Sequence, residues 1–144
     1  MPYIRVWIHY VWATKNRNPI LTQDIRYILF DHIKQNATAK GIYLDRINGH
    51  FEHVHCLISL GSSQTIDKVA QLLKGESSYW FNNRSGFSAP KLEWQDEYFA
   101  VSIGESGINA VRAYIDNQEE HHKKRTFAQE YEEFISKYGF PISG

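Results

Sequence analysis

The run His53-Val54-His55-Cys56-Leu57-Ile58-Ser59-Leu60, which follows Asn48-Gly49, is the most informative part of the sequence. Its apolar residues alternate with others and Asn-Gly is a turn signal, so the run is predicted to be a strand of a hairpin. Residues two apart on a strand point to the same face. His53 and His55 are therefore expected side by side on an open face of a sheet. The alternate residues are expected to face a core: Val54, Cys56, Ile58 and Leu60.

A pair of imidazoles that project together from an open strand can hold a metal ion. Two surface histidines on the wet side of a sheet give the same pattern without binding an ion. The pair His53 and His55 by itself leaves both interpretations open.

The segments around this strand alternate between strand and helix patterns. In chain order they are a strand at 3–14, a helix at 22–40, strands at 42–48 and 53–60, a helix at 65–82, an irregular loop at 83–96 that holds Gly86, and a strand at 97–103. This order is the split βαβ, or ferredoxin-like, pattern that RNA-recognition domains also share. We therefore expect an α+β fold with a four-stranded antiparallel sheet and two helices on one face. The open face is expected to carry the histidines together with Tyr98, Ala100 and Ser102.

Further helices are predicted after this core, at about 107–123 and 127–138. Tyr114 and Gln118 are four residues apart, so they lie on one side of the first of these helices. They flank its apolar stripe, and they can present a hydroxyl and an amide oxygen together at the edge of a docked helix. The alternative is a tyrosine at a core margin and a glutamine in solvent.

Composition sets limits on the protein's class. At 144 residues the chain is predicted to be a single domain over 1–144, with a core at about 3–104 and a helical part at 105–144. The formal net charge is zero, so no overall basic field indicates a nucleic-acid partner. One cysteine excludes a disulfide within the chain and fits a reducing cytoplasm. No run is apolar enough to span a membrane, and the N-terminus does not look like a signal peptide.

The His-x-His strand and the Tyr-x-x-x-Gln helix together resemble the HUH single-tyrosine transposases of bacterial insertion sequences. This group includes the transposases associated with repetitive extragenic palindromes. The resemblance extends over roughly residues 3 to 125. Its blocks are Val11-Trp12-Ala13-Thr14-Lys15-Asn16-Arg17, Gly49-His50 through Leu57, Trp94-Gln95-Asp96-Glu97-Tyr98-Phe99-Ala100-Val101-Ser102, and Tyr114-Ile115-Asp116-Asn117-Gln118-Glu119-Glu120-His121-His122.

The resemblance implies a metal-dependent enzyme that cleaves and rejoins single-stranded DNA. Tyr114 would be the nucleophile and would form a covalent 5′-phosphotyrosine. His53 and His55, with Gln118 as a third ligand, would hold Mg²⁺ or Mn²⁺, which neutralises the phosphodiester's charge.

The resemblance also implies two partners, a DNA substrate and a second copy of the chain. The substrate would be a single-stranded DNA hairpin. Lys15, Arg17 and Arg46 lie near the ends of predicted strands, so they are expected near its phosphates, and His50 is expected near a base. The protein would be a homodimer in which the tyrosine helix completes the active site of the other subunit. His121 and His122 are expected to be no more than a cationic helix end.

Two other functions remain open from the residues. A noncatalytic nucleic-acid-binding module could share this fold, although the third strand carries histidines in place of the usual aromatic RNA-binding signature. A metal-dependent nuclease without a covalent step would use the histidines and would not need Tyr114.

Overall fold

Four strands form one antiparallel sheet in the order β2-β3-β1-β4. Their bounds are β1 (Trp7–Ala13), β2 (Tyr43–Gly49), β3 (His53–Ser59) and β4 (Phe99–Ile103). The structure is a computed structural model that describes residues 2–84 and 90–139. The sheet order confirms the predicted ferredoxin-like arrangement. Residues 85–89, which include Gly86 of the predicted loop, lie outside the described residues.

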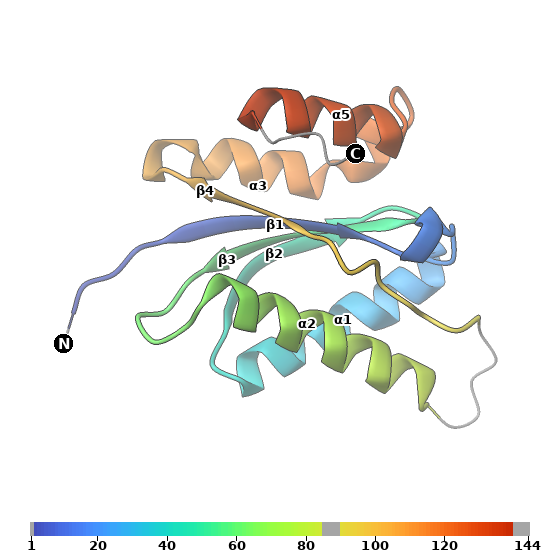
Figure 1. Cartoon of the computed structure of the whole chain (residues 1–144), viewed down its shortest axis with the longest axis horizontal. Coiled ribbons are helices and arrows are strands. Elements are labelled where there is room, and N and C mark those ends of the chain that lie inside the picture. The colour runs from blue at the N-terminus through green and yellow to red at the C-terminus, as the bar shows by residue number, and fades with distance from the viewer. Residues whose placement is uncertain (1, 85–89, 140–144) are drawn as a thin grey trace.

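Helices α1 (Gln23–Ala39) and α2 (Ile66–Asn82) cover one face of the sheet (Figure 1). Thr65 caps α2 by accepting a hydrogen bond from the backbone N–H of Lys68. The core between the helices and this face contains the predicted side chains of β3, namely Val54, Cys56 and Ile58, together with Tyr10 and Trp12 of β1. The alternation along β3 is therefore confirmed.

Three further helices cover the opposite face: α3 (Ile108–Asp116), α4 (Gln118–His122) and α5 (Phe127–Tyr138). Figure 1 shows α3 and α5 on the far side of the sheet from α1 and α2. The expectation that this face stays open is wrong, because His53 and His55 are both fully buried. Trp7 and Val11 of β1 point to the same face as the histidines and are also buried, so this side of the sheet is apolar enough to need a cover.

The predicted orientation of β4 is also wrong. Val11 pairs with both His55 and Phe99, so Phe99 lies on the histidine face, with Val101 and Ile103 beyond it. Tyr98 and Ala100 instead pack against the core formed with α1 and α2. Alternation alone could not assign the two faces, because both faces of this sheet are covered.

The predicted helix at 107–123 is divided in two. Residues Glu105–Gly107 form a short 3₁₀ turn, α3 follows, and the backbone leaves the helical conformation at Asn117, with φ −103° and ψ 26°, before α4 begins. A second 3₁₀ turn, at Lys15–Arg17, follows β1. No helix among the described residues has the length and apolar character needed to cross a membrane.

Candidate metal and tyrosine site

His53 and His55 lie side by side on β3, with their ring centres 5.0 Å apart. They lie beneath the helices that follow β4. Phe127 of α5 stacks on the ring of His53 at 4.2 Å, and Tyr114 of α3 meets His55 edge-on at 5.5 Å. The predicted pair is therefore present, in a site closed off by the C-terminal helices.

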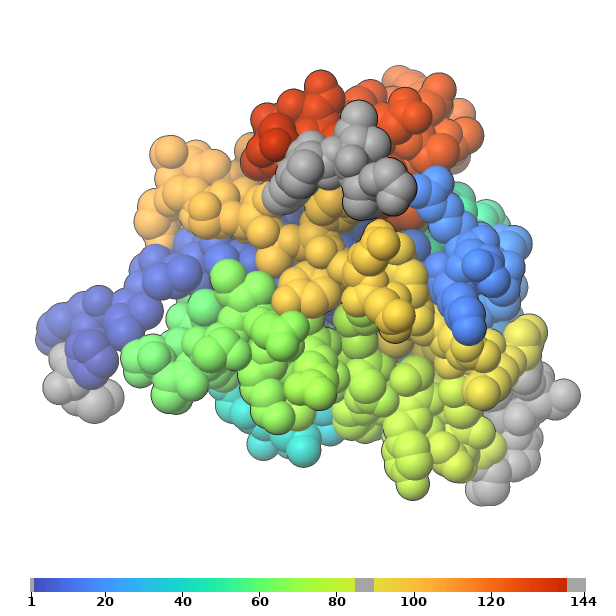
Figure 2. All heavy atoms as spheres, in the orientation of Figure 1, coloured from blue at the N-terminus to red at the C-terminus, as the bar shows by residue number. Residues whose placement is uncertain are grey.

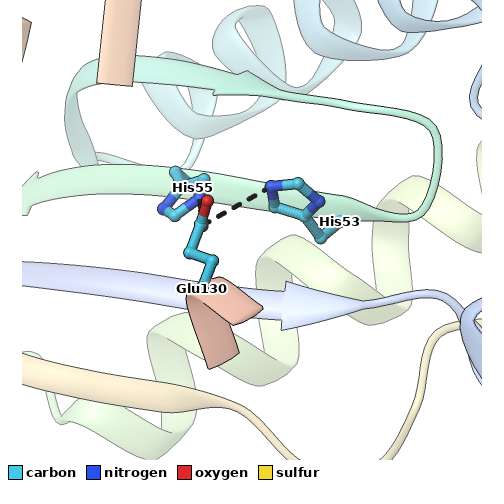
Figure 3. A group of neighbouring side chains, drawn as sticks. All are labelled: His53, His55 and Glu130. Carbon is cyan, nitrogen blue, oxygen red and sulfur yellow. Dashed lines mark hydrogen bonds and ion pairs between the residues drawn. The ribbon is translucent and has the colours of Figure 1, made fainter. Parts of the chain in front are cut away.

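Glu130 on α5 points between the two histidines (Figure 3). Its Oε1 lies 2.6 Å from His55 Nε2 and 3.7 Å from His53 Nε2. One ligand atom from each of the three residues falls within 4.8 Å of the other two. This glutamate was not among the predicted site residues. Its spacing could have identified it. Glu130 follows Phe127 by three residues and so lies on the buried, apolar side of an amphipathic helix. A carboxylate on that side is unusual unless it has a partner.

Gln118, the predicted third ligand, is fully buried in the same cluster. Its Oε1 lies 3.1 Å from His53 Nε2 and 3.2 Å from His122 Nε2, while its amide nitrogen donates to the backbone carbonyl of Tyr114. After the break at Asn117, α4 begins at Gln118. Gln118 remains beside Tyr114 although the two residues belong to different helices.

His121 and His122 also belong to the cluster, so the expectation of a simple cationic helix end is wrong. Their Nε2 atoms lie 3.2 and 3.0 Å from Oε2 of Glu130. Despite this proximity, Glu130 Oε2 is buried and makes no hydrogen bond of acceptable geometry with the residues that the structure describes. A buried acceptor without a well-aligned donor is costly, which is one reason to expect a cation there.

Outer partners orient both histidines. The Nδ1–H of His53 donates to the Glu52 carboxylate at 2.8 Å, and Nδ1 of His55 is hydrogen-bonded to Nε2 of His9 at 3.0 Å. Each histidine therefore directs Nε2 toward Glu130. Metal-binding histidines are commonly held in this way through their second nitrogen. His9 was not among the predicted site residues.

The charge states in the cluster match those of a metal site. Burial lowers the pKa of His55 to about 4 and that of His9 to about 3, so both rings are neutral near pH 7. Burial would raise the pKa of Glu130, but the nearby rings of His122 and His55 outweigh it and hold that pKa far below the usual range. Neutral imidazoles and an ionised carboxylate are the forms that bind a divalent cation.

The donor set fits such a cation. When His53 donates from Nδ1, its Nε2 carries a lone pair, and Gln118 Oε1 and Glu130 Oε1 lie 3.1 and 3.7 Å away. Acceptors that converge in this way repel one another unless a cation lies between them. Two imidazoles with oxygen ligands are compatible with Mg²⁺ or Mn²⁺, and Zn²⁺ accepts the same set.

Contacts between α3 and the sheet hold Tyr114 in place. Arg112 makes two hydrogen bonds to the Asp45 carboxylate on β2, and Asn48 donates to the carbonyl of Ile115. Burial and the negative charge of Glu130 raise the pKa of Tyr114 above its usual value. Tyr114 approaches His55 of its own chain, and completion of the site by a second subunit stays a prediction.

The residues predicted to bind DNA lie around this site, with different partners. Lys15 pairs with Glu93 at 3.4 Å, and Arg46 pairs with Asp116 at 3.4 Å. The guanidinium of Arg17 lies over the ring of Tyr131 on α5, at 4.8 Å. His50 stacks on His122 with ring centres 4.8 Å apart. Contact of these four residues with DNA stays a prediction.

Comparison with known proteins provides a family and a fold. The family model described as "Transposase IS200 like" matches residues 3–118 and so ends before His121, His122 and Glu130. The chain resembles the crystal structure of a candidate transposase from Deinococcus radiodurans R1, with 23% identity and a TM-score of 0.62 over 82% of this chain and 95% of that one. It also resembles a REP-associated tyrosine transposase bound to a REP hairpin, with 18% identity and a TM-score of 0.59 over 85% of this chain and 72% of that one. No curated protein sequence matches it significantly.

Proposed function

The chain belongs to the IS200-like transposase family, and on this basis we propose that it cleaves and rejoins single-stranded DNA through a covalent bond to Tyr114. The observation that carries the proposal is the meeting of Tyr114 with two histidines, an amide oxygen and a carboxylate in one buried cluster. Neither a simple binding module nor a nuclease that uses water as nucleophile requires a tyrosine there.

In the proposed step the phenolic oxygen of Tyr114 attacks the phosphorus of a phosphodiester. A bond forms between that oxygen and phosphorus, and the bond from phosphorus to the 3′ oxygen breaks. The departing 3′ oxygen keeps the electron pair and takes up a proton to become a 3′-hydroxyl, while the phenolic proton passes to solvent. The 5′-phosphotyrosine retains the ester bond, so attack by another 3′-hydroxyl reverses the step and rejoins the strand.

We propose that His53, His55, Gln118 and Glu130 hold Mg²⁺ or Mn²⁺. Such an ion supplies positive charge beside the phosphodiester and offsets the carboxylate that raises the pKa of Tyr114. The protein's own part is to orient these groups: Glu52 and His9 fix the two imidazoles, and side chains of α3 and α5 pack over them.

The proposed substrate is a hairpin of single-stranded DNA, as in the neighbouring structure that is bound to one. Lys15 and Arg46 have well-exposed side chains and are proposed to meet its phosphates. A homodimer and a cytoplasmic location are parts of the same proposal. Since one chain brings all the groups together, we propose that each subunit can act with its own Tyr114.

The test is a search for a covalent adduct. The protein is incubated with labelled single-stranded DNA that contains an imperfect hairpin, with Mn²⁺, and then denatured. We expect an adduct that survives denaturation. Tyr114→Phe should abolish it while DNA binding remains, and His53→Ala should abolish metal-dependent cleavage.

Tyr131→Phe is the matched control, since it removes a hydroxyl from a half-buried tyrosine on α5 that is outside the cluster. This variant should form the adduct as the unmodified protein does. Cleaved DNA with free 5′-phosphates and no adduct would favour the nuclease without a covalent step. Binding without cleavage under Mg²⁺, Mn²⁺ or Zn²⁺ would favour the binding module.

A further inference from the structure

A hollow of about 370 Å³ lies between α3 and α5, beside the metal and tyrosine cluster. In Figure 1 the orange α3 and the red α5 lie on the same side of the sheet, and Figure 2 shows the orange and red atoms near each other in the same orientation. The side of α3 that borders the hollow includes Val111 and Tyr114. The side of α5 includes Phe134, with Lys137 and Tyr138 three and four residues later and so on the same side of the helix. We call this hollow the α3–α5 groove.

The α3–α5 groove is continuous with the site already described. Tyr114, His9 and Glu130 line its inner end. A phosphodiester within reach of Tyr114 brings a neighbouring sugar and base with it, and these need a place next to the cluster. The volume is within the range of roughly 300–1,000 Å³ that small-molecule pockets occupy.

The chemistry of the groove wall suits a nucleotide. Phe134 and Tyr138 lie with ring centres 5.5 Å apart, and aromatic side chains are the usual platforms on which unpaired bases stack. Lys137 is exposed at the same end of α5 and supplies a positive charge for a phosphate. Arg125, at the other end, is paired with Glu133, so its charge is already offset.

We propose that the α3–α5 groove binds the nucleotide of single-stranded DNA that adjoins the phosphate attacked by Tyr114. Its base stacks against Tyr138 and its phosphate meets Lys137. This inference rests on the proposed function, because the groove is assigned by its position next to the nucleophile. It assigns a substrate contact to α5, all of which lies beyond the residues that match the family.

The experiment combines abasic DNA with variants of Tyr138. The cleaved phosphate is first located from the 3′-hydroxyl fragment that the unmodified protein releases. Binding is then measured in a Tyr114→Phe background, with the base removed at each position from three before to three after that phosphate. We expect one adjoining abasic position to weaken binding by at least fivefold, since stacking of one base contributes about 1–3 kcal/mol.

Tyr138→Leu should weaken binding of intact DNA by a similar factor and should make binding insensitive to that abasic position. Tyr138→Phe keeps the ring and should behave as the parent protein does. Lys137→Ala should weaken binding and lower the slope of log affinity against log salt by about one. Lys34→Ala removes an exposed lysine from α1, on the opposite side of the sheet, and should change neither.

Thymidine 5′-monophosphate serves as a separate probe. Competition with DNA by the free nucleotide, lost in Tyr138→Leu, would indicate that the groove binds nucleotides whether or not they belong to a strand. The groove assignment is overturned if the adduct forms but Tyr138→Leu keeps the full sensitivity to every abasic position. Failure of the unmodified protein to form any adduct would instead remove the proposed function, and the groove assignment with it.

Discussion

Glu130 is the residue on which most of the cluster depends. Nε2 atoms of four histidines approach its two oxygens, at 2.6 Å from His55, 3.7 Å from His53, 3.2 Å from His121 and 3.0 Å from His122. Removing one member of a buried charged network leaves its partners without compensation, so the effect of a substitution here should exceed that of an ordinary surface ion pair.

Glu130→Gln keeps the shape of the side chain and removes its charge. We expect the dissociation constant for Mn²⁺ to rise at least tenfold, since even partners outside the ligand shell contribute that much. Titration calorimetry on the protein without DNA measures this directly. Glu133→Gln changes the next turn of the same helix and should bind Mn²⁺ with unchanged affinity. Equal affinities for Glu130→Gln and the unmodified protein would exclude Glu130 as a ligand.

His9 should affect stability in acid when no metal is present. Its folded pKa of about 3 and that of His55, about 4, lie below the usual value of 6.5. Between these limits the unfolded chain binds protons that the folded chain does not. The free energy of unfolding should therefore be unaffected above pH 6.5 and should fall as the pH drops toward 4, by up to about 1.4 kcal/mol per pH unit for each histidine.

His9→Gln removes one of these two groups. Urea unfolding of the metal-free variant at pH 7, 6 and 5 should give a shallower decline than the unmodified protein, by up to about 1.4 kcal/mol per pH unit. The dependence of the free energy on urea should stay the same, which would confirm that both proteins unfold from equally compact states. If the free energy of unfolding fell equally with pH in His9→Gln and in the unmodified protein, the burial of a neutral His9 would be contradicted.

At the scale of elements, α5 depends on its first turn. Thr126 and Gln129 form a capping box in which each side chain hydrogen-bonds the other's backbone N–H. The helix carries Glu130 just inside this cap, and Phe127 at its start packs against Val11 and Ala13. The cap therefore stabilises the element that delivers the carboxylate to the site.

Thr126→Ala should cost about 1 kcal/mol of helix stability and loosen α5 without altering any ligand. We expect faster hydrogen exchange of the α5 amides and weaker Mn²⁺ binding. Thr65→Ala removes the equivalent cap of α2, on the other side of the sheet, and is the matched control. It should lower overall stability by a similar amount and leave the relative protection of α5 unchanged. The same loss of Mn²⁺ affinity in both variants would assign the effect to general instability.

The elements were largely predictable because their signals are local. The bounds of β3, α1 and α2 match the predicted runs to within one or two residues at each end. What depends on distant contacts was not predictable. The docking of α3 to α5 determines three features: the cover over the histidine face, the break at Asn117 and the orientation of β4. The sequence of a strand does not show whether a helix packs on it.

The candidate site also contains residues that local motifs predict and residues that only distant contacts bring in. His53, His55, Tyr114 and Gln118 stand in short motifs, and the sequence identified all four as one set by resemblance to a family. Glu130 lies 75 residues from His55, and His9 lies 46 residues before it. The contact of His9 with His55 depends on the register of β1 against β3, and the contact of Glu130 with His55 depends on the docking of α5. A single sequence predicts neither.

At the scale of the whole molecule, the structure predicts that one chain suffices for the covalent step. Tyr114→Phe retains the histidines, and His53→Ala retains the tyrosine. A mixture of the two variants should form no adduct if each site uses its own tyrosine, because neither chain is complete. Adduct formation by the mixture at more than a few per cent of the unmodified level would show that subunits exchange their helices. Sedimentation of the same samples tests the proposed homodimer.

The placement of Glu130 has a consequence for biosynthesis. A ribosome that has just translated His55 must add 75 more residues before the carboxylate that meets it exists. While those residues are being added, His53 and His55 have no carboxylate from α5 beside them, and the nascent polypeptide cannot form the proposed metal site. The proposed cleavage of DNA therefore has to wait until α5 has been translated.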